Sequence, residues 1–225
     1  MSETENELGT IAIIGGTGHL GAAIARRLAK AGCELVIGSR NADSAEVAAR
    51  EIGADVRGMA NRDAAAAGDL IVVTVPFAAQ EATLSDIAPH VAGKVVIDTT
   101  VPLVPPRVMR VQLPPEGSAA VRAQALLGAG ATVVSGFHNV AAHKLATDEA
   151  VDCDVLVFGD DRPARRKAVR LAEHCGLRGI EAGALANSVA AEALTSVLIF
   201  VNKTYQVDGA GFRITGKMVD SAPAN

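Results

Sequence analysis

A glycine-rich turn near the start of the sequence has the residue types and the spacing that bind a dinucleotide. Gly16, Gly18 and Gly21 form the pattern G-x-G-x-x-G directly after the apolar run 10–14. One glycine permits a tight turn, one lets the backbone approach a pyrophosphate, and the last allows a helix to pack closely on a strand. A helix that begins near His19 would direct free N–H groups at the phosphates. The cofactor-binding residues predicted from this turn are Gly16, Thr17, Gly18, His19, Leu20 and Gly21.

The segment after the second apolar run indicates which dinucleotide binds. An NAD site usually has an aspartate or a glutamate about 20 residues beyond the glycines, and its carboxylate binds the 2′-hydroxyl of the ribose. This sequence has Gly38, Ser39, Arg40 and Asn41 there instead. A carboxylate would repel a 2′-phosphate, whereas a hydroxyl and a guanidinium can bind it through charge-assisted hydrogen bonds. Ser39 and Arg40 therefore predict NADP as the cofactor.

These motifs lie in a pattern of alternating strands and helices, which predicts a parallel sheet covered on both faces. The expected strands are 10–14, 34–37, 70–75, 94–98 and 131–135, and the expected helices are 20–31, 43–52, 78–90 and 118–127. Five prolines between positions 99 and 115 exclude regular structure there and indicate a functional loop.

A strand at 155–158 and helices at 162–175 and 184–205 make a smaller second part. The predicted fold is therefore α/β. It has a doubly wound Rossmann-type parallel sheet in a domain at 9–137 and a small C-terminal α/β capping domain at 138–218.

Composition and charge exclude several classes of protein. The 225 residues are 49% hydrophobic and carry a formal net charge of −4, so neither nucleic acid nor an anionic membrane is an expected partner. Three cysteines without a C-x-x-C pair indicate reduced thiols, and no metal site is predicted. The acidic start of the sequence lacks signal-peptide features, which predicts a cytoplasmic protein. Residues 1–8 and 219–225 are expected to be disordered tails.

The most apolar segment, 184–201, predicts a buried helix and not a membrane span. Polar residues interrupt it at Asn187, Ser188, Glu192, Thr195 and Ser196, whereas a span needs roughly 20 mostly apolar residues. Its apolar surface exceeds what a small domain can bury alone. The sequence therefore predicts a homodimer.

The residues for acid–base catalysis in short-chain dehydrogenases are absent. Those enzymes use a tyrosine four residues before a lysine, but the single tyrosine is Tyr205 and Gly209 follows it at that spacing. The sequence also offers no obvious Ser-His-Asp set or paired carboxylates. Hydride transfer between two stacked cofactor rings needs little such machinery, because the cofactors carry the chemistry and the protein orients them.

Several short segments together resemble the NADPH-dependent deazaflavin (coenzyme F420) reductases, also called F420:NADP oxidoreductases. The likeness covers nearly the whole chain, from position 11 to about 216, and it depends on the order and spacing of the segments. They are GGTGHLG at 15–21, GSR at 38–40, TVP at 74–76, EGSAA at 116–120, FHNV at 137–140, VFGDD at 157–161, ALT at 193–195 and RITG at 213–216.

The resemblance implies a hydride transfer between NADPH and F420, with the deazaflavin stacked over a nicotinamide at the carboxyl ends of the strands. It implies that Thr17 lies near the nicotinamide and that Ser39 and Arg40 hold the 2′-phosphate. It also implies that His138, Val140 and Thr195 line the acceptor pocket. The catalytic residues predicted in this way are His138, Thr17 and Thr195, and the further cofactor-binding residues are Thr74, Val75, Pro76 and Val140.

Two positions depart from the family pattern and leave alternatives open. The family often has a basic residue where Ser44 stands, and another where Val189 follows Asn187 and Ser188. Because Val189 is apolar, the sequence defines the identity of the hydride acceptor less well than that of the donor. The alternatives are an NADPH-dependent reductase of a flavin, an imine or a ketone, and a non-catalytic NADP(H) sensor.

Overall fold

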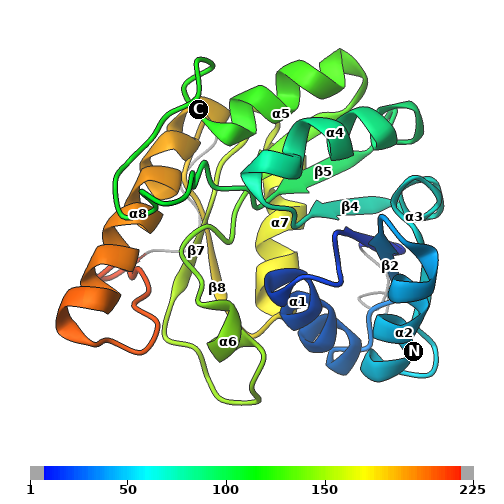
Figure 1. The fold of residues 1–225 in the computed structure, drawn as a ribbon, viewed down its shortest axis with the longest axis horizontal. Coiled ribbons are helices and arrows are strands. Elements are labelled where there is room, and N and C mark those ends of the chain that lie inside the picture. The colour runs from blue at the N-terminus through cyan, green and yellow to red at the C-terminus, as the bar shows by residue number, and fades with distance from the viewer. Residues whose placement is uncertain (1–7, 219–225) are drawn as a thin grey trace.

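The computed structural model describes residues 8–218. The predicted tails at 1–8 and 219–225 lie outside the described residues, except for Leu8, which is buried. The main sheet has six parallel strands in the order β3-β2-β1-β4-β5-β6, which confirms the predicted Rossmann-type sheet (Figure 1). The strands are β1 (Ile11–Ile14), β2 (Leu35–Ser39), β3 (Arg57–Ala60), β4 (Leu70–Val73), β5 (Val95–Asp98) and β6 (Thr132–Ser135).

Helices cover both faces of this sheet because its strands are apolar on both sides. The side chains of Ile11, Ile13 and alternate residues of the neighbouring strands pack against α1 (His19–Lys30), α2 (Ala42–Ile52) and α7 (Arg162–His174). Those of Ala12, Ile14 and their neighbours pack against α3 (Asn61–Ala67), α4 (Phe77–Ile87) and α5 (Ala119–Leu127). The fold is therefore doubly wound, as the sequence predicts.

The C-terminal part adds a second, two-stranded parallel sheet. It consists of β7 (Asp154–Val157) and β8 (Arg178–Glu181), and an antiparallel bridge between Ser135 and Phe158 joins it to the edge of the main sheet. Helix α7 connects the two strands, and its buried residues belong to the same hydrophobic cluster as β1. The division into domains at 137/138 stays a prediction.

The remaining elements are short, apart from α8 (Ser188–Tyr205). They are the single-turn α6 (Ala142–Leu145) and the 3-10 turns η1 (Ala88–His90), η2 (Gly128–Gly130) and η3 (Leu185–Asn187). Between Asp98 and Ala119 the chain has no helix or strand, as its prolines predict. The Arg110 carbonyl in this loop accepts a hydrogen bond of 3.5 Å from the Ser196 hydroxyl on α8.

Helix α8 is only partly buried, which corrects the expectation of a buried helix. Residues 185–205 are long and apolar enough to cross a membrane, with a mean hydropathy of 1.4. One face carries Ser188, Ala191, Glu192 and Ser196 into the α/β body, as in a soluble enzyme. Val197 and Phe200 are about half exposed.

Candidate active site

The glycines of the first turn stand where side chains would collide. A Cβ atom on Gly21 would lie 2.5 Å from the Thr74 hydroxyl oxygen, and one on Gly16 would lie 2.9 Å from the Ile13 carbonyl oxygen. Gly15 has a φ angle of 73°, in the left-handed region that glycine adopts readily. No side chain caps α1 at Gly18, so the N–H groups of its first turn, from His19 to Gly21, are free to bind phosphate.

The hydroxyl of Thr17 lies 3.5 Å from the hydroxyl of Ser39. The contact brings Thr17, in the turn after β1, beside the end of β2, where Arg40 follows Ser39. Arg40 is exposed, and no carboxylate in residues 8–218 pairs with it. The Asn41 side chain caps α2 by accepting the backbone N–H of Ser44 at 3.2 Å.

The segment Thr74-Val75-Pro76 continues from β4 at the point where the sheet order reverses. Strands β1 and β4 are neighbours there, although β2 and β3 lie between them in sequence. The Thr74 hydroxyl donates to the Ile14 carbonyl at 2.9 Å, which ties this segment to the glycine turn. Ligands of open α/β sheets bind beyond the carboxyl ends of the strands at such a switch point.

His138 follows β6 and is buried, with both ring nitrogens unpartnered among the described residues. Burial lowers its pKa to about 4, so the ring is neutral at pH 7. The Thr195 hydroxyl donates to the His138 carbonyl at 2.9 Å, so the structure brings these two predicted residues together. Val140 packs against the main hydrophobic cluster, so part of its side chain belongs to the core.

Sequence reasoning missed Asn139, which connects this segment to α8. Its side-chain amide donates to the Ala191 carbonyl at 2.9 Å and to the Thr195 hydroxyl at 3.1 Å. The residue lies between the two predicted residues His138 and Val140. Its signals in the sequence are this adjacency and its place in the family-like segment FHNV at 137–140.

Two buried carboxyl groups also escaped the sequence analysis. Asp98 at the end of β5 accepts hydrogen bonds from Thr100 and Gln80, and burial raises its pKa to about 6. Glu192 on α8 accepts the N–H groups of Ala119 and Ala120. Burial, with a smaller effect of the Asp98 charge, raises its pKa to about 7. These two acids are far apart in the sequence, so no local spacing indicated that both would be buried.

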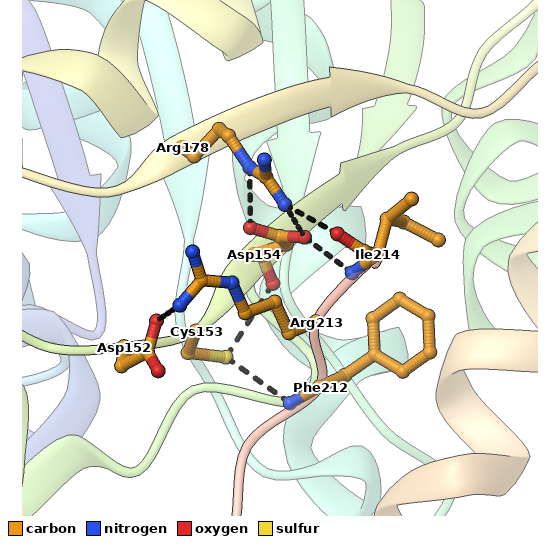
Figure 2. A network of polar contacts seen from close by, with 7 residues as sticks. All are labelled: Asp152, Cys153, Asp154, Arg178, Phe212, Arg213 and Ile214. Atoms are coloured by element: carbon orange, nitrogen blue, oxygen red, sulfur yellow. Dashed lines mark hydrogen bonds and ion pairs between the residues drawn. The ribbon is translucent and has the colours of Figure 1, made fainter. Parts of the chain in front are cut away.

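The segment that follows α8 is held against β7 by a polar network (Figure 2). The buried carboxylate of Asp154 accepts two hydrogen bonds from Arg178, at 2.7 and 2.6 Å, and the Ile214 N–H at 2.6 Å. The Arg178 guanidinium also donates to the Ile214 carbonyl at 2.8 Å, and the Asp154 N–H donates to the Phe212 carbonyl at 2.7 Å. We call this set of contacts the Asp154 clamp. It fixes the segment 212–214, which follows α8, against β7 and β8.

Residues 8–218 contain no group of three or more His, Cys, Asp or Glu side chains placed to hold a metal ion. Three groups of residues lie at the carboxyl ends of the strands. They are the glycine turn, the group Thr17, Ser39 and Arg40, and the segment His138–Val140, which contacts α8. This arrangement can bind a dinucleotide phosphate and leaves a buried neutral imidazole beside α8.

Comparison with known proteins agrees with this geometry. Residues 10–102 match the family model described as "NADP oxidoreductase coenzyme F420-dependent". The chain is 44% identical over 218 residues to an F420-dependent NADP reductase of Methanothermobacter thermautotrophicus, with 91% of this chain and 94% of that protein covered. It is 38% identical to the protein of the same description from Methanocaldococcus jannaschii, over 91% of this chain and 97% of that protein.

A solved structure described as a putative F420-dependent NADP reductase from Arthrobacter sp. FB24 has the same fold. It superposes with a TM-score of 0.81 at 26% identity, covering 92% of this chain and 99% of that one. The sequence similarity and the shared fold both extend over nearly the whole chain. This protein belongs to the F420-dependent NADP oxidoreductase family.

Proposed function

We propose that this protein transfers a hydride between NADP(H) and the deazaflavin coenzyme F420. The observation that carries the proposal is the 44% identity, over 91% of the chain, to a protein described as an F420-dependent NADP reductase. The site fits the donor cofactor, because the glycines let the turn pack closely on β4 and no side chain caps the first turn of α1, whose N–H groups can bind a pyrophosphate. Buried His138, with two unpartnered ring nitrogens, fits a polar ligand beside it.

On the donor side, the glycine turn and the first turn of α1 bind the pyrophosphate. Ser39 and Arg40 bind the 2′-phosphate, as the sequence predicts, and Thr17 joins them because its hydroxyl lies beside Ser39. This assignment replaces the predicted place of Thr17 near the nicotinamide. Thr74, Val75 and Pro76 form the floor under the remainder of the dinucleotide, at the switch point of the sheet.

On the acceptor side, the chain orients the two rings and excludes water. NADPH supplies the hydride from C4 of its nicotinamide, and the deazaflavin accepts it at C5. The neutral imidazole of His138 offers one donor and one acceptor to a ring placed beside it. Thr195 fixes the backbone at His138, because its hydroxyl donates to the His138 carbonyl. Val140 closes the edge of the pocket.

Two further features remain proposals. The half-exposed Val197 and Phe200 on α8 favour a homodimer that covers this face, since an apolar helix face is stabilised by burial. The polar surface and the cofactor chemistry are those of a cytoplasmic enzyme.

Direct hydride transfer is tested with NADPH that carries deuterium at the transferred C4 position. Anaerobic mixing with oxidised F420 is expected to bleach the deazaflavin absorbance and to place the label at its C5, because no residue in the site relays the hydride. FMN and FAD serve as control acceptors. Loss of the label to solvent, or reduction of a control acceptor but not of F420, would contradict the proposal.

Val189 gives a second test, because it stands where the family often has a basic residue. The side chain is half-buried near the start of α8. Val189→Arg adds a cation for an anionic coenzyme and is expected to lower the KM for F420 while leaving the KM for NADPH unchanged. The matched control is Ala190→Arg on the exposed face of the same turn. A loss of thermal stability with no change in either KM would identify Val189 as a core residue.

A further inference from the structure

Glu192 makes a contact that joins two distant parts of the molecule. Its side chain is 1% exposed, and its two carboxylate oxygens accept the N–H groups of Ala119 at 2.7 Å and Ala120 at 3.1 Å. These are the first two residues of α5, whose own cap, Ser118, accepts the N–H of Val121. A negative group at the positive end of a helix is favourable, and here it comes from another helix.

A second contact lies one turn earlier on α8. The Ser188 hydroxyl donates to the Ser118 hydroxyl at 2.9 Å, and both residues are fully buried. Ser188 and Glu192 are four residues apart, so they lie on one face of α8. This face therefore binds the start of α5 through two side chains, Ser188 and Glu192.

The same face of α8 also holds the segment after β6, since Ala191 and Thr195 lie three and seven residues after Ser188. Asn139 bonds the Ala191 carbonyl and the Thr195 hydroxyl, and Thr195 in turn bonds the His138 carbonyl. One face of α8 thus contacts both α5 and the chain that carries His138. Any shift of the helix away from α5 moves Thr195 and the contact that supports His138.

The start of α5 is itself tied to the end of β5. The Gln80 side-chain amide donates to the Asp98 carboxylate at 2.8 Å and to the Ala119 carbonyl at 2.9 Å. The connection therefore runs without a gap from the carboxyl end of the sheet, through Gln80 and Ala119, to Glu192. It links the edge at which the dinucleotide binds to the helix that borders the acceptor.

We infer that Glu192 is a positioning residue for the hydride transfer, because it fixes α8, and with it Thr195 and His138, at the spacing that brings the two rings together. This inference rests on the proposed function. The rate of such a transfer depends steeply on the approach of the reacting atoms, and a displacement of about 1 Å can cost roughly 100-fold. The KM for NADPH is expected to stay unchanged, because the residues proposed to hold its phosphates, the glycine turn with Ser39 and Arg40, are not among the hydrogen-bond partners of Glu192 in residues 8–218.

The test is Glu192→Gln, with Glu173→Gln on the exposed surface of α7 as the matched control. The amide keeps the size of the side chain, but one of its two polar atoms is a donor and cannot accept an N–H group. We expect kcat for F420 reduction to fall by about 10- to 100-fold, with the KM for NADPH unchanged. The control variant is expected to match the unmutated protein.

Amide hydrogen exchange gives a readout that needs no acceptor. In Glu192→Gln the amides of Ala119 and Ala120 are expected to exchange at least about tenfold faster, since each loses a charged acceptor. Amides at the start of α1 are expected to keep their rates. If the unmutated protein does not reduce F420, the proposed function fails, but the exchange at Ala119 still reports whether Glu192 holds the two helices together.

Glu192→Asp is a second variant, which keeps the inference testable if Glu192→Gln does not fold. Aspartate keeps the charge but is one methylene shorter, so it is expected to bind NADPH normally and to give an intermediate kcat. An unmutated kcat in both variants would overturn the inference. A loss of NADPH affinity as large as the loss of kcat would also overturn it, because Glu192 would then support the whole fold.

Discussion

Replacing Arg40 by alanine is expected to weaken NADPH binding by about 30- to 150-fold and to leave NADH binding unchanged. The loss corresponds to roughly 2–3 kcal/mol, the contribution of a charge-assisted hydrogen bond to phosphate. Arg40 is exposed beside the Thr17 and Ser39 hydroxyls, with no carboxylate partner in the described part of the chain, so its charge is free for a ligand. NADH lacks the 2′-phosphate and gains nothing from it.

Calorimetric titration of both nucleotides measures this preference, and Arg50→Ala on the exposed side of α2 is the matched control. The control removes the same charge from another exposed position, in the last turn of α2. Equal affinity of the unmutated protein for NADPH and NADH would contradict the assignment of the 2′-phosphate site. A similar loss in Arg50→Ala would indicate general attraction by positive charge.

Substituting Asp154 by alanine is expected to lower the free energy of unfolding by about 2–3 kcal/mol. Asp154 is 4% exposed, and its carboxylate accepts bonds from Arg178 and from the Ile214 N–H, so its loss leaves the Ile214 N–H without this acceptor and Arg178 with only the Ile214 carbonyl. The guanidinium of Arg178 is 42% exposed and regains water, which keeps the loss below that for a fully buried pair. Urea denaturation gives the measurement.

The effect of Asp154 also depends on pH in a defined direction. Hydrogen bonding to Arg178 lowers the pKa of the Asp154 carboxyl below its ordinary value. Its stabilisation is therefore complete above the ordinary aspartate pKa and is lost as the pH falls through the lowered one. The unmutated protein and Asp154→Ala should converge in strongly acidic solution. Asp152→Ala, which removes an exposed partner of Arg213, is the control, and an equal loss there would refute a special role for Asp154.

The strands at the centre of the sheet could be predicted because they are continuous apolar runs. Strands β3 and β8 were missed, since RGMA and RGIE are short edge strands with a glycine and little apolar surface. Helix α3 was missed as well, because four consecutive alanines give no helical periodicity. The structure defines these elements through long-range pairing, which no local pattern in the sequence records.

In the site, too, local motifs could be predicted from the sequence, whereas contacts between distant residues could not. The glycine turn and the Ser39-Arg40 pair are local motifs, and the structure places them together at the ends of β1 and β2. The place of Thr17 near the nicotinamide came from the family resemblance, whereas its contact with Ser39 spans 22 residues and has no local signal in the sequence. Glu192 and its partners at the start of α5 are more than 70 residues apart, so no spacing rule could join them.

The Asp154 clamp has a consequence for the order in which the chain matures during synthesis. Strands β7 and β8 can pair once residue 181 has left the ribosome. The clamp cannot form until Ile214 has been made, and α8 lies between residues 181 and 214 in the sequence. During that interval Asp154 and Arg178 have each other but not the backbone of Ile214, and the apolar face of α8 is made before the segment that follows it is fixed. Closing a loop of about 60 residues is slow compared with forming a helix. The C-terminal part is therefore the last to reach its final packing, and its apolar surface stays exposed for longer than that of the main sheet.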